Sequence, residues 1–236
     1  MDFFISTKNR TDKEELMDDF SIGGDLLRDT LDKLENINRW LGGNLMTVKA
    51  LKKVLKNHPK EQELTIADIG CGHGDILRDV AKFGRKNGYK MKLIGMDANP
   101  TAIAYANELS TEFPELSFKT EDIFSEAFKN RKFDVVLATL FLHHFKEAQL
   151  VSFLGNTLKQ TKIGIVVNDL HRHKLAYYLF MLLSVFIKNN MIIEDGLTSV
   201  LRGFKRNELV HISNKLKVKP QISWKWAFRF QWILKY

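Results

Sequence analysis

A glycine-rich loop is the first segment of this sequence whose residue types could do chemistry. It spans 68–75 and reads Asp-Ile-Gly-Cys-Gly-His-Gly-Asp, between an apolar run and a helical pattern. Glycines at such a junction let the backbone approach a ligand at the helix N-terminus. The carboxylates of Asp68 and Asp75 would repel a pyrophosphate and attract a cation, and the dinucleotide pattern requires glycine or alanine at position 75. The loop therefore favours a ligand that carries positive charge and no phosphate.

A further carboxylate, Asp97, ends the next apolar run and follows Gly74 by 23 residues. A carboxylate at that distance from a glycine loop can accept hydrogen bonds from both ribose hydroxyls of a bound nucleoside. S-adenosylmethionine has a ribose, an ammonium group and a sulfonium group, and it has no phosphate. The loop and Asp97 therefore favour S-adenosylmethionine as the cofactor, with S-adenosylhomocysteine as its product, over a nicotinamide dinucleotide.

Four segments resemble, in order, the successive motifs of class I S-adenosylmethionine-dependent methyltransferases, a Rossmann-like family with a seven-stranded sheet. They are 68–75, 96–100 (Met-Asp-Ala-Asn-Pro), 120–123 (Thr-Glu-Asp-Ile) and 133–144. The resemblance covers about residues 64–170. It implies that Asp122 contacts the adenine amino group, with a helix N-cap as the structural alternative, and that Thr139 and Leu140 line the methionine end of the cofactor. The predicted cofactor-binding residues are Asp68, Gly70, Cys71, Gly72, Gly74, Asp97, Ala98, Asp122, Ile123, Thr139 and Leu140.

The elements that must position these residues alternate along the chain. Apolar runs typical of buried strands occupy five ranges, and helical patterns separate them. These ranges are 64–69, 92–96, 116–119, 133–138 and 163–167. Two final strand-like runs, 218–223 and 228–235, have no helix between them and should pair antiparallel. This order predicts an α/β fold, with a doubly wound, mostly parallel sheet and a C-terminal antiparallel hairpin.

About 60 residues precede the first of these strands, and their patterns are helical and amphipathic. Residues 11–14 (Thr-Asp-Lys-Glu) read as a capping box, so a helix should run from there to about residue 20. Further helices should begin near Asp25 and Asn44. We therefore predict an N-terminal helical lid at 1–60, followed by an S-adenosylmethionine-binding methyltransferase domain at 61–236.

An apolar helix is expected as an insertion at 174–189, after the fifth strand, where this fold usually places substrate-binding segments. Its central part, 175–187, is apolar almost all round and is too short to span a bilayer. A helix so apolar must be buried on most sides, as a wall of an acceptor pocket, as a core helix or in a dimer interface. Together with the N-terminal lid, it would close over the cofactor and exclude water from an apolar acceptor cavity.

The segment after the fourth strand argues for a small acceptor. Residues 138–142 are apolar and lack the polar motif with which enzymes hold the exocyclic amines of bases, and the one cysteine, Cys71, lies in the cofactor loop. The pair His143-His144 resembles small-molecule methyltransferases of the quinone-biosynthesis type. Three further segments resemble a bacterial subgroup often encoded beside polyketide or phenolic-lipid synthases, namely 38–43, 168–173 and 195–204. These resemblances imply O-methylation of a phenolic or pyrone hydroxyl.

A phenol with a pKa of about 10 needs a base at neutral pH. Ligands of an open α/β sheet bind at the carboxyl ends of its strands, and histidines follow the fourth and fifth strands there. His144, His171 and His143 are the predicted catalytic residues, and none of them is singled out as the base. No metal is predicted, because these histidines show no ligand spacing with a carboxylate.

Charge leaves two other function classes open. The net charge is +8, and residues 202–236 hold nine Lys or Arg and one acid. A methyltransferase that acts on RNA or protein through this basic C-terminus is therefore one alternative. A solvated strand face explains the charge more simply, and nucleic acid is not the expected partner. A non-catalytic S-adenosylmethionine-binding subunit is the other, and the intact loop and Asp97 argue against it.

The remaining composition points to the cytoplasm. No apolar stretch reaches the length of a membrane span, the first residues do not read as a signal peptide, and one cysteine excludes an internal disulfide. We expect a cytoplasmic enzyme whose partner is a small hydrophobic or aromatic acceptor. Peripheral contact with a membrane and a homodimer remain open.

Overall fold

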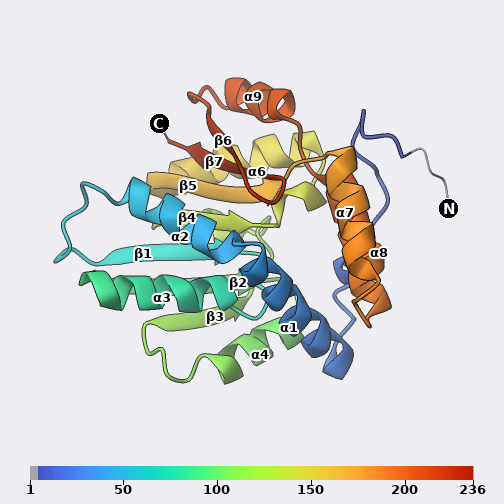
Figure 1. The fold of residues 1–236 in the computed structure, drawn as a ribbon. Helices are drawn as coiled ribbons and strands as arrows, with labels where there is room; N and C mark the ends of the chain where they lie inside the picture. The colour runs from blue at the N-terminus through green and yellow to red at the C-terminus, as the bar shows by residue number, and fades with distance from the viewer. Residues whose placement is uncertain (1–4, 236) are drawn as a thin grey trace.

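One sheet of seven strands, in the order β3-β2-β1-β4-β5-β7-β6, organises the computed structural model, which describes residues 5–235 (Figure 1). The strands are β1 Leu64–Ile69, β2 Met91–Asp97, β3 Leu116–Thr120, β4 Phe133–Thr139, β5 Thr161–Leu170, β6 Gln221–Lys225 and β7 Arg229–Leu234. The first five are parallel, and β7 pairs antiparallel with β5 and with β6. The predicted α/β fold with its C-terminal antiparallel hairpin is confirmed.

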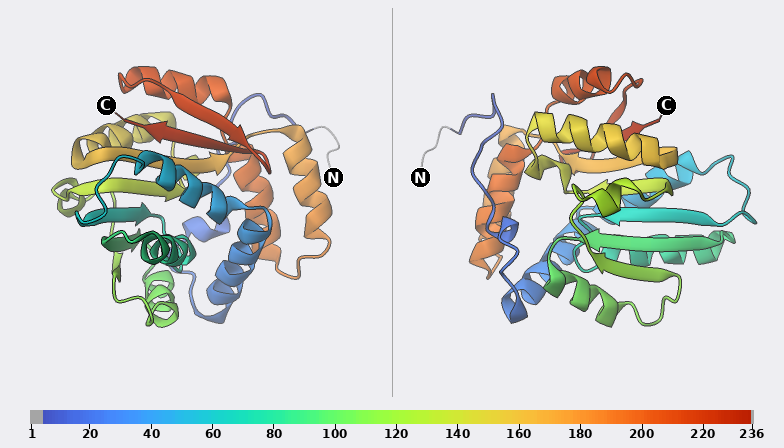
Figure 2. Two further views of the ribbon diagram at one scale, coloured as in Figure 1. Left: turned by 60° about the vertical axis from the view of Figure 1, so that its left-hand side comes forward. Right: turned by 180° about the vertical axis from the view of Figure 1, so that it is seen from behind.

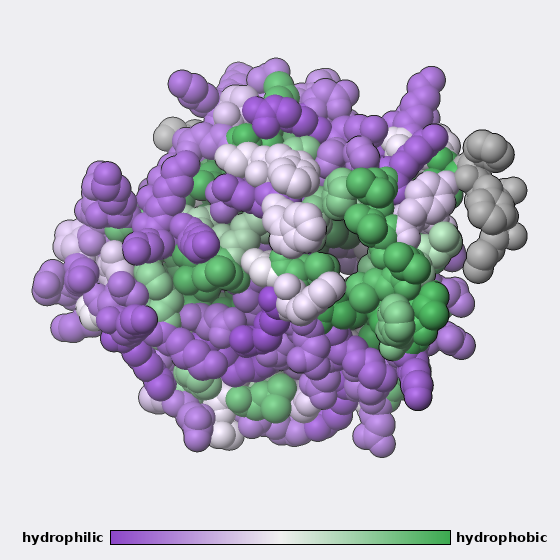
Figure 3. All heavy atoms as spheres, in the orientation of Figure 1, coloured by the Kyte–Doolittle hydropathy of each residue, from purple (hydrophilic) through white to green (hydrophobic). Residues whose placement is uncertain are grey.

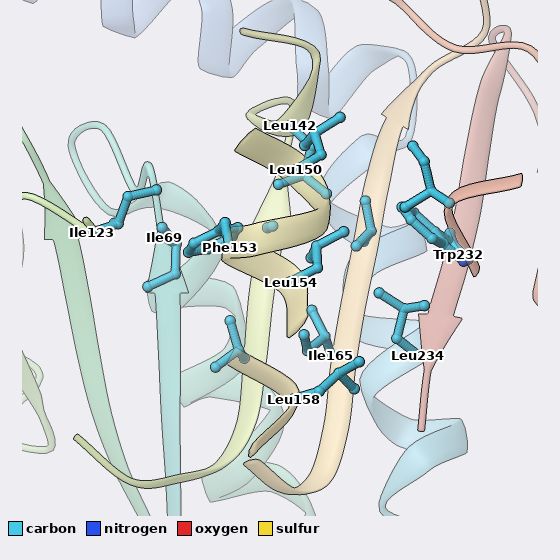
Figure 4. Close-up of a cluster of buried hydrophobic side chains, with 14 of the residues drawn as sticks. Ile69, Ile123, Leu142, Leu150, Phe153, Leu154, Leu158, Ile165, Trp232 and Leu234 are labelled. Carbon is cyan, nitrogen blue, oxygen red and sulfur yellow. The ribbon is translucent and has the colours of Figure 1, made fainter. Parts of the chain in front are cut away.

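Helices cover both faces of this sheet because successive side chains of each strand point to opposite faces. On one face, α2 (Gly43–Val54) and α3 (Asp75–Asn87) pack on alternate residues of β1 and β4. On the other face lie α6 (Glu147–Gln160) and α9 (Arg206–Lys215), and Figure 4 shows the α6 side chains against β1, β5 and β7. The remaining helices are α1 Gly24–Trp40, α4 Pro100–Leu109, α5 Glu126–Lys129, α7 Lys174–Ser184 and α8 Asn190–Arg202, with short 3₁₀ turns η1 Leu16–Asp18 and η2 Leu142–His144.

The helix predicted between residues 11 and 20 is wrong. Only the 3₁₀ turn η1 forms there, and the segment around it runs along α8 (Figure 2). The N–H groups of Leu16 and Met17 donate to the carboxylate of Asp195 in α8, at 2.6 and 2.9 Å, instead of entering a helix. Contacts with a distant helix thus override the local capping signal. Residues 1–4 of the predicted lid lie outside the described residues.

Helices α1 and α2 begin at Gly24 and Gly43, close to the predicted starts. Leu51 of α2 and Leu55, just after its end, are completely buried in the sheet's own core, whereas α1 packs on α4 and α8 beyond the sheet. The division into a lid at 1–60 and a domain at 61–236 stays a prediction.

Helix α7 is not buried as expected. It ends at Ser184 rather than near residue 189, and Ala176 is its one buried residue. Leu182 is 63% exposed and Phe186, just after the helix, is 80% exposed, so apolar side chains gather on the surface where α7 lies (Figure 3). Helix α8 packs against α7, with the ring of Phe180 against Gly196. No helix in the described part of the chain is long and apolar enough to cross a membrane.

Candidate functional site

The loop between β1 and α3 has a shape that depends on its glycines. Gly70 and Gly72 have φ values of 67° and 52°, a left-handed backbone that residues with a side chain adopt at a cost. A Cβ on Gly70 would collide with the ring of Phe141. The N–H groups of Gly70 and Cys71 donate to the carbonyl of Met96 in β2, at 2.8 and 3.1 Å. The loop is therefore held at the carboxyl ends of β1 and β2.

Two carboxylates stand beside this loop, Asp68 buried and Asp97 partly buried. Asp97, at the end of β2, accepts hydrogen bonds from the N–H groups of Gly72 and Asn99, both at 2.9 Å. Asp68, in β1, is 2% exposed, and its Oδ1 has no hydrogen-bond partner. Burial raises the pKa of Asp68 well above its usual range, and the carboxylates of Asp75 and Asp97 raise it further. A cation with hydrogen-bond donors would satisfy Oδ1 and stabilise the ionised form of this carboxyl group.

A cavity of about 110 Å³ borders Asp68 and brings together many of the residues predicted to bind the cofactor. Its lining includes the predicted residues Asp68, Gly70, Cys71, Gly72, Thr139 and Leu140, together with the acid Asp75. The unpartnered oxygen of Asp68 fits the ammonium of S-adenosylmethionine, and the surrounding acids fit its positive charge. These residues would hold the methionine end of that cofactor.

The other predicted cofactor residues lie elsewhere. Asp97 lines a second, larger cavity, described below, whereas Gly74, Ala98, Asp122 and Ile123 line neither of the two. Oδ1 of Asp122 accepts a hydrogen bond from the N–H of Phe124 at 2.9 Å, which makes a local turn before α5. This contact is not an N-cap, because the N-cap of α5 is Ser125, whose Oγ accepts a hydrogen bond from the N–H of Phe128. The adenine contact of Asp122 stays a prediction. Ile123 packs in the core beside α6.

The larger cavity has a volume of about 1070 Å³ and adjoins the small one through Gly70, Gly72 and Leu140. Its walls come from many parts of the chain, chiefly the N-terminal segment 10–20, α1, the stretch after β4 and α8. The glycine loop also contributes, as do single residues of α7 and β7, namely Phe180 and Arg229. Leu140 has a φ of 51°, which is uncommon for a residue with a side chain. Its N–H donates to the carbonyl of Asn168 in β5 at 2.8 Å, which holds this turn in place.

His143 lies on the wall of the larger cavity and is 2% exposed. Its Nδ1 is 2.7 Å from Oδ1 of Asp169, and its Nε2 is 3.5 Å from Oε1 of Glu15. Burial alone would lower the pKa of His143, but the carboxylates of Asp169 and Glu15 outweigh it and raise that pKa to about 9. Because Asp169 binds Nδ1, the neutral ring would carry its proton there and present Nε2 as the acceptor.

His144 also lines this cavity, but its ring is held by the N-terminal segment. Its Nδ1 is 2.7 Å from Oδ1 of Asp18, whose Oδ2 accepts a hydrogen bond from Nη1 of Arg202 at 2.6 Å. Arg202 also donates to the backbone carbonyls of His143 and His144. The two predicted histidines are therefore fixed by charged groups from η1 and α8.

His171, the third predicted catalytic residue, is absent from the lining of both cavities. Its Nδ1 accepts a hydrogen bond from Nε1 of Trp224 at 3.2 Å, and its ring centroid is 4.7 Å from that of Phe230. Burial lowers the pKa of His171 to about 4, and the charges of His173, Lys205 and Arg172 add to the effect. The structure thus separates His171 from His143 and His144.

Several charged side chains of the site were not foreseen from the sequence. They are Arg10, Glu15, Asp18, Asp169 and Arg229, all near or on the wall of the larger cavity. Asp169 comes two residues after the predicted fifth strand at 163–167, so its place at that edge was a usable signal. The other four gave none. Glu15, His143 and His144 offer metal-ligand atoms within 4.8 Å of one another, but Asp18 and Arg202 already pair with members of this group. The absence of a metal stays a prediction.

Comparison with known proteins gives one family match and several relatives. A family model described as a methyltransferase domain matches residues 60–187. A ubiquinone biosynthesis O-methyltransferase from Rickettsia canadensis is 28% identical over 141 residues, which cover 58% of this chain and 56% of the relative. A carboxy-S-adenosyl-L-methionine synthase from Nitratiruptor is 29% identical over 99 residues, 41% of this chain and 40% of the relative. This chain thus spans little more than half the length of the first of these relatives.

Solved structures of similar fold cover more of the chain. The plantazolicin methyltransferase BpumL in complex with SAH has a TM-score of 0.65 and 17% identity, with 89% of this chain and 88% of that chain covered. The magnesium protoporphyrin IX methyltransferase of Synechocystis PCC 6803, with bound SAM, has a TM-score of 0.56 and 12% identity, with 86% and 84% covered. At these identities the likeness is one of fold.

Proposed function

This chain belongs to the methyltransferase-domain family, and from this premise we propose that it transfers a methyl group from S-adenosylmethionine to a hydroxyl group of a small apolar or aromatic molecule. The family model covers more than half of the chain, and the family predicted from the sequence is confirmed. The acceptor and the atom that is methylated belong to the proposal. The name of the Rickettsia relative, an O-methyltransferase, supports an oxygen atom.

The larger cavity is the observation that carries this proposal. It adjoins the acid-lined cavity, so a molecule inside it would lie next to the methionine end of the cofactor. Its volume of about 1070 Å³ is at the upper end for ligand pockets and leaves room for an acceptor beside the nucleoside. The N-terminal segment closes one side, because Leu16 and Met17 are bound to Asp195 of α8. A space bounded in this way suits a small molecule better than a polymer.

S-adenosylmethionine, when bound, supplies a methyl group that its sulfonium has already activated. Asp68 would hold the ammonium and Asp97 the ribose hydroxyls, so the protein's main task is to align the acceptor and remove its proton. His143 is the residue we propose for that proton, which Nε2 would accept while Asp169 holds Nδ1. A pKa of about 9 for His143 is close to the pKa of about 10 of a phenol, so proton transfer between them is nearly balanced.

The structure gives no observation that favours RNA or protein as the acceptor. Two of the nine basic residues of the C-terminal segment, Arg202 and Arg229, are 8% and 3% exposed. Both line the larger cavity, so part of the positive charge of this segment is inside the molecule. The positive charge that residues 202–236 present on the surface is therefore smaller than their sequence suggests.

A product assay tests the proposed function. The protein is incubated with S-adenosylmethionine and a panel of phenolic lipids, hydroxylated quinone precursors and pyrones, and products are identified by mass. We expect a singly methylated product with the wild type and a strongly reduced yield with His143→Gln. The matched control His58→Gln changes a partly exposed histidine outside both cavities and should retain the yield. Methylation of added RNA or protein, with no product from the panel, would contradict the proposal.

A further inference from the structure

Arg229, the first residue of β7, carries a buried guanidinium group without a matched partner. The residue is 3% exposed, and neither Nε nor Nη1 has a hydrogen-bond partner. Charged groups in a protein interior are normally paired and hydrogen-bonded, since burial removes their water. An unpartnered buried group in a native protein calls for a specific explanation, and a functional role at a site is one such explanation.

The nearest acid, Asp169, is already occupied by other donors. Its Oδ1 accepts from Nδ1 of His143 and from the N–H of Leu170, and its Oδ2 accepts from the N–H groups of Leu142 and His143. Burial lowers the pKa of Arg229 to about 10, although the charge of Asp169 opposes this, so the guanidinium is protonated at neutral pH. Among the described residues, Arg229 thus keeps a full positive charge that no carboxylate neutralises by direct contact.

The surroundings of Arg229 leave its guanidinium free to meet a ligand. Arg229 lines the larger cavity, as does Asn38 at the end of α1. A Cβ on Gly43, the first residue of α2, would collide with both the Asn38 side chain and Nη1 of Arg229. Oδ1 of Asn38 is also without a hydrogen-bond partner. The glycine therefore makes room for these two polar groups at one corner of the larger cavity.

We infer that the guanidinium of Arg229 binds a carboxylate of the methyl acceptor, so that the substrates of this cavity are small apolar or aromatic acids. A guanidinium presents parallel N–H donors that match the two oxygens of a carboxylate. The inference rests on the proposed function and narrows its substrate class. Arg229 is a binding residue in this account, and the proton still leaves through His143.

The cofactor also carries a carboxylate, on its methionine part, so the same chemistry has two sources. The positions of the residues favour the acceptor. The methionine end is assigned to the small cavity, which Asp68, Asp75 and Thr139 line and Arg229 does not. Arg229 lines only the larger cavity. The experiment separates the two sources by measuring cofactor and acceptor binding independently.

The test uses calorimetry on the full chain, first with S-adenosylhomocysteine and then with two probes added to the loaded protein. The probes are 1-hydroxy-2-naphthoate and the matched neutral 1-hydroxy-2-naphthamide. With Arg229→Gln we expect the naphthoate to bind roughly ten to a hundred times more weakly, because a hydrogen-bonded ion pair is lost. Binding of the naphthamide and of S-adenosylhomocysteine should stay within about threefold. Lys225→Gln, which removes a positive charge opposite Arg229 in the β6–β7 pair but outside the cavity, should change neither.

The melting temperature of Arg229→Gln and a second variant, Arg229→Lys, keep the result unambiguous. Since Arg229→Gln removes a buried charge without a partner, its melting temperature should equal or exceed that of the wild type. Arg229→Lys keeps the charge and should retain a preference for the naphthoate. Weaker binding of S-adenosylhomocysteine to Arg229→Gln with unchanged naphthoate binding would assign the carboxylate to the cofactor and overturn the inference. Equal binding of naphthoate and naphthamide to the wild type would also overturn it, whereas failure of the wild type to bind S-adenosylhomocysteine would reject the proposed function itself.

Discussion

Nδ1 of His143 lies 2.7 Å from Oδ1 of Asp169, and the two residues are 2% and 1% exposed. Asp169 sits near the end of β5 and His143 in the turn η2 after β4, so two neighbouring parallel strands build this pair. The N–H groups of Leu142 and His143 also donate to Oδ2 of Asp169, which fixes the carboxylate. The pair therefore holds the imidazole in one orientation at the wall of the larger cavity.

The first prediction concerns the pH dependence of methyl transfer. Nε2 of His143 accepts a proton only when the ring is neutral, and the pKa of His143 is raised to about 9. Activity, measured as kcat/KM, should therefore rise with pH and level off above an apparent pKa near 9. Asp169→Asn removes a carboxylate that raises this pKa, so its profile should shift to lower pH while the maximal rate falls. A profile that is flat from neutral to alkaline pH would rule out His143 as the base.

A second prediction concerns acid stability and the contact of α1 with the glycine loop. Glu35 in α1 lies 3.0 Å from Nε2 of His73 in the loop. Its contacts with His73 and Arg39 lower the pKa of Glu35 to about 2, although burial alone would raise that pKa. A carboxyl group with a lowered pKa stabilises the fold above its unfolded pKa of about 4.3, and the contribution disappears as the pH falls toward 2. Glu35→Gln should flatten this part of the stability curve in chemical denaturation. Glu61→Gln, an exposed control, should leave the curve unchanged.

A third prediction separates the two roles open to Asp122. If its carboxylate accepts the adenine amino group, Asp122→Ala should weaken S-adenosylhomocysteine more than the inosine analogue that lacks this amine. The structure shows a local turn, in which Oδ1 accepts from the N–H of Phe124 at 2.9 Å, while Ser125 caps α5. If that turn is its whole role, both ligands should bind alike to wild type and variant in calorimetry, and the variant should lose at most about 1 kcal/mol of stability.

A fourth prediction uses two leucines on different helices. Leu154 of α6 is completely buried, whereas Leu182 of α7 is 63% exposed. Leu154→Ala should lower the free energy of unfolding by about 2–5 kcal/mol, because it leaves a cavity in the core. Leu182→Ala should change it by less than about 0.5 kcal/mol. A large and concentration-dependent loss for Leu182→Ala would instead mean that α7 is covered by a second copy of the chain.

The sheet and the cofactor loop were predictable because their signals are local. The spacing of Gly70, Gly72 and Gly74, and the apolar runs that become β1 to β5, depend on neighbouring residues alone. The outcome for α7 was not predictable in this way. Its composition indicated burial, but how much of it is covered depends on where α8 lies, and Leu182 stays exposed although α8 packs against the helix.

The partners of the histidines depend even more on tertiary structure. His143 and His144 were found from their place after a strand, but Glu15 and Asp18 reach them from the N-terminal segment. That segment does not form the helix its sequence pattern predicts, and Asp195 of α8 binds its backbone instead. The sequence shows Arg229 only as one of the basic residues near the C-terminus. Its burial follows from the position of β7 against β5.

Calorimetry of S-adenosylhomocysteine binding tests the central assignment of this site most directly. We expect the wild type to bind with a dissociation constant in the micromolar range, on the order of −8 kcal/mol. Asp97→Ala should weaken binding by roughly tenfold or more, because Asp97 anchors Gly72 of the loop and is placed to hold the ribose. Glu112→Ala, which removes an exposed acid, should bind like the wild type. Equal affinity of wild type and Asp97→Ala, or no binding to either, would contradict the assignment.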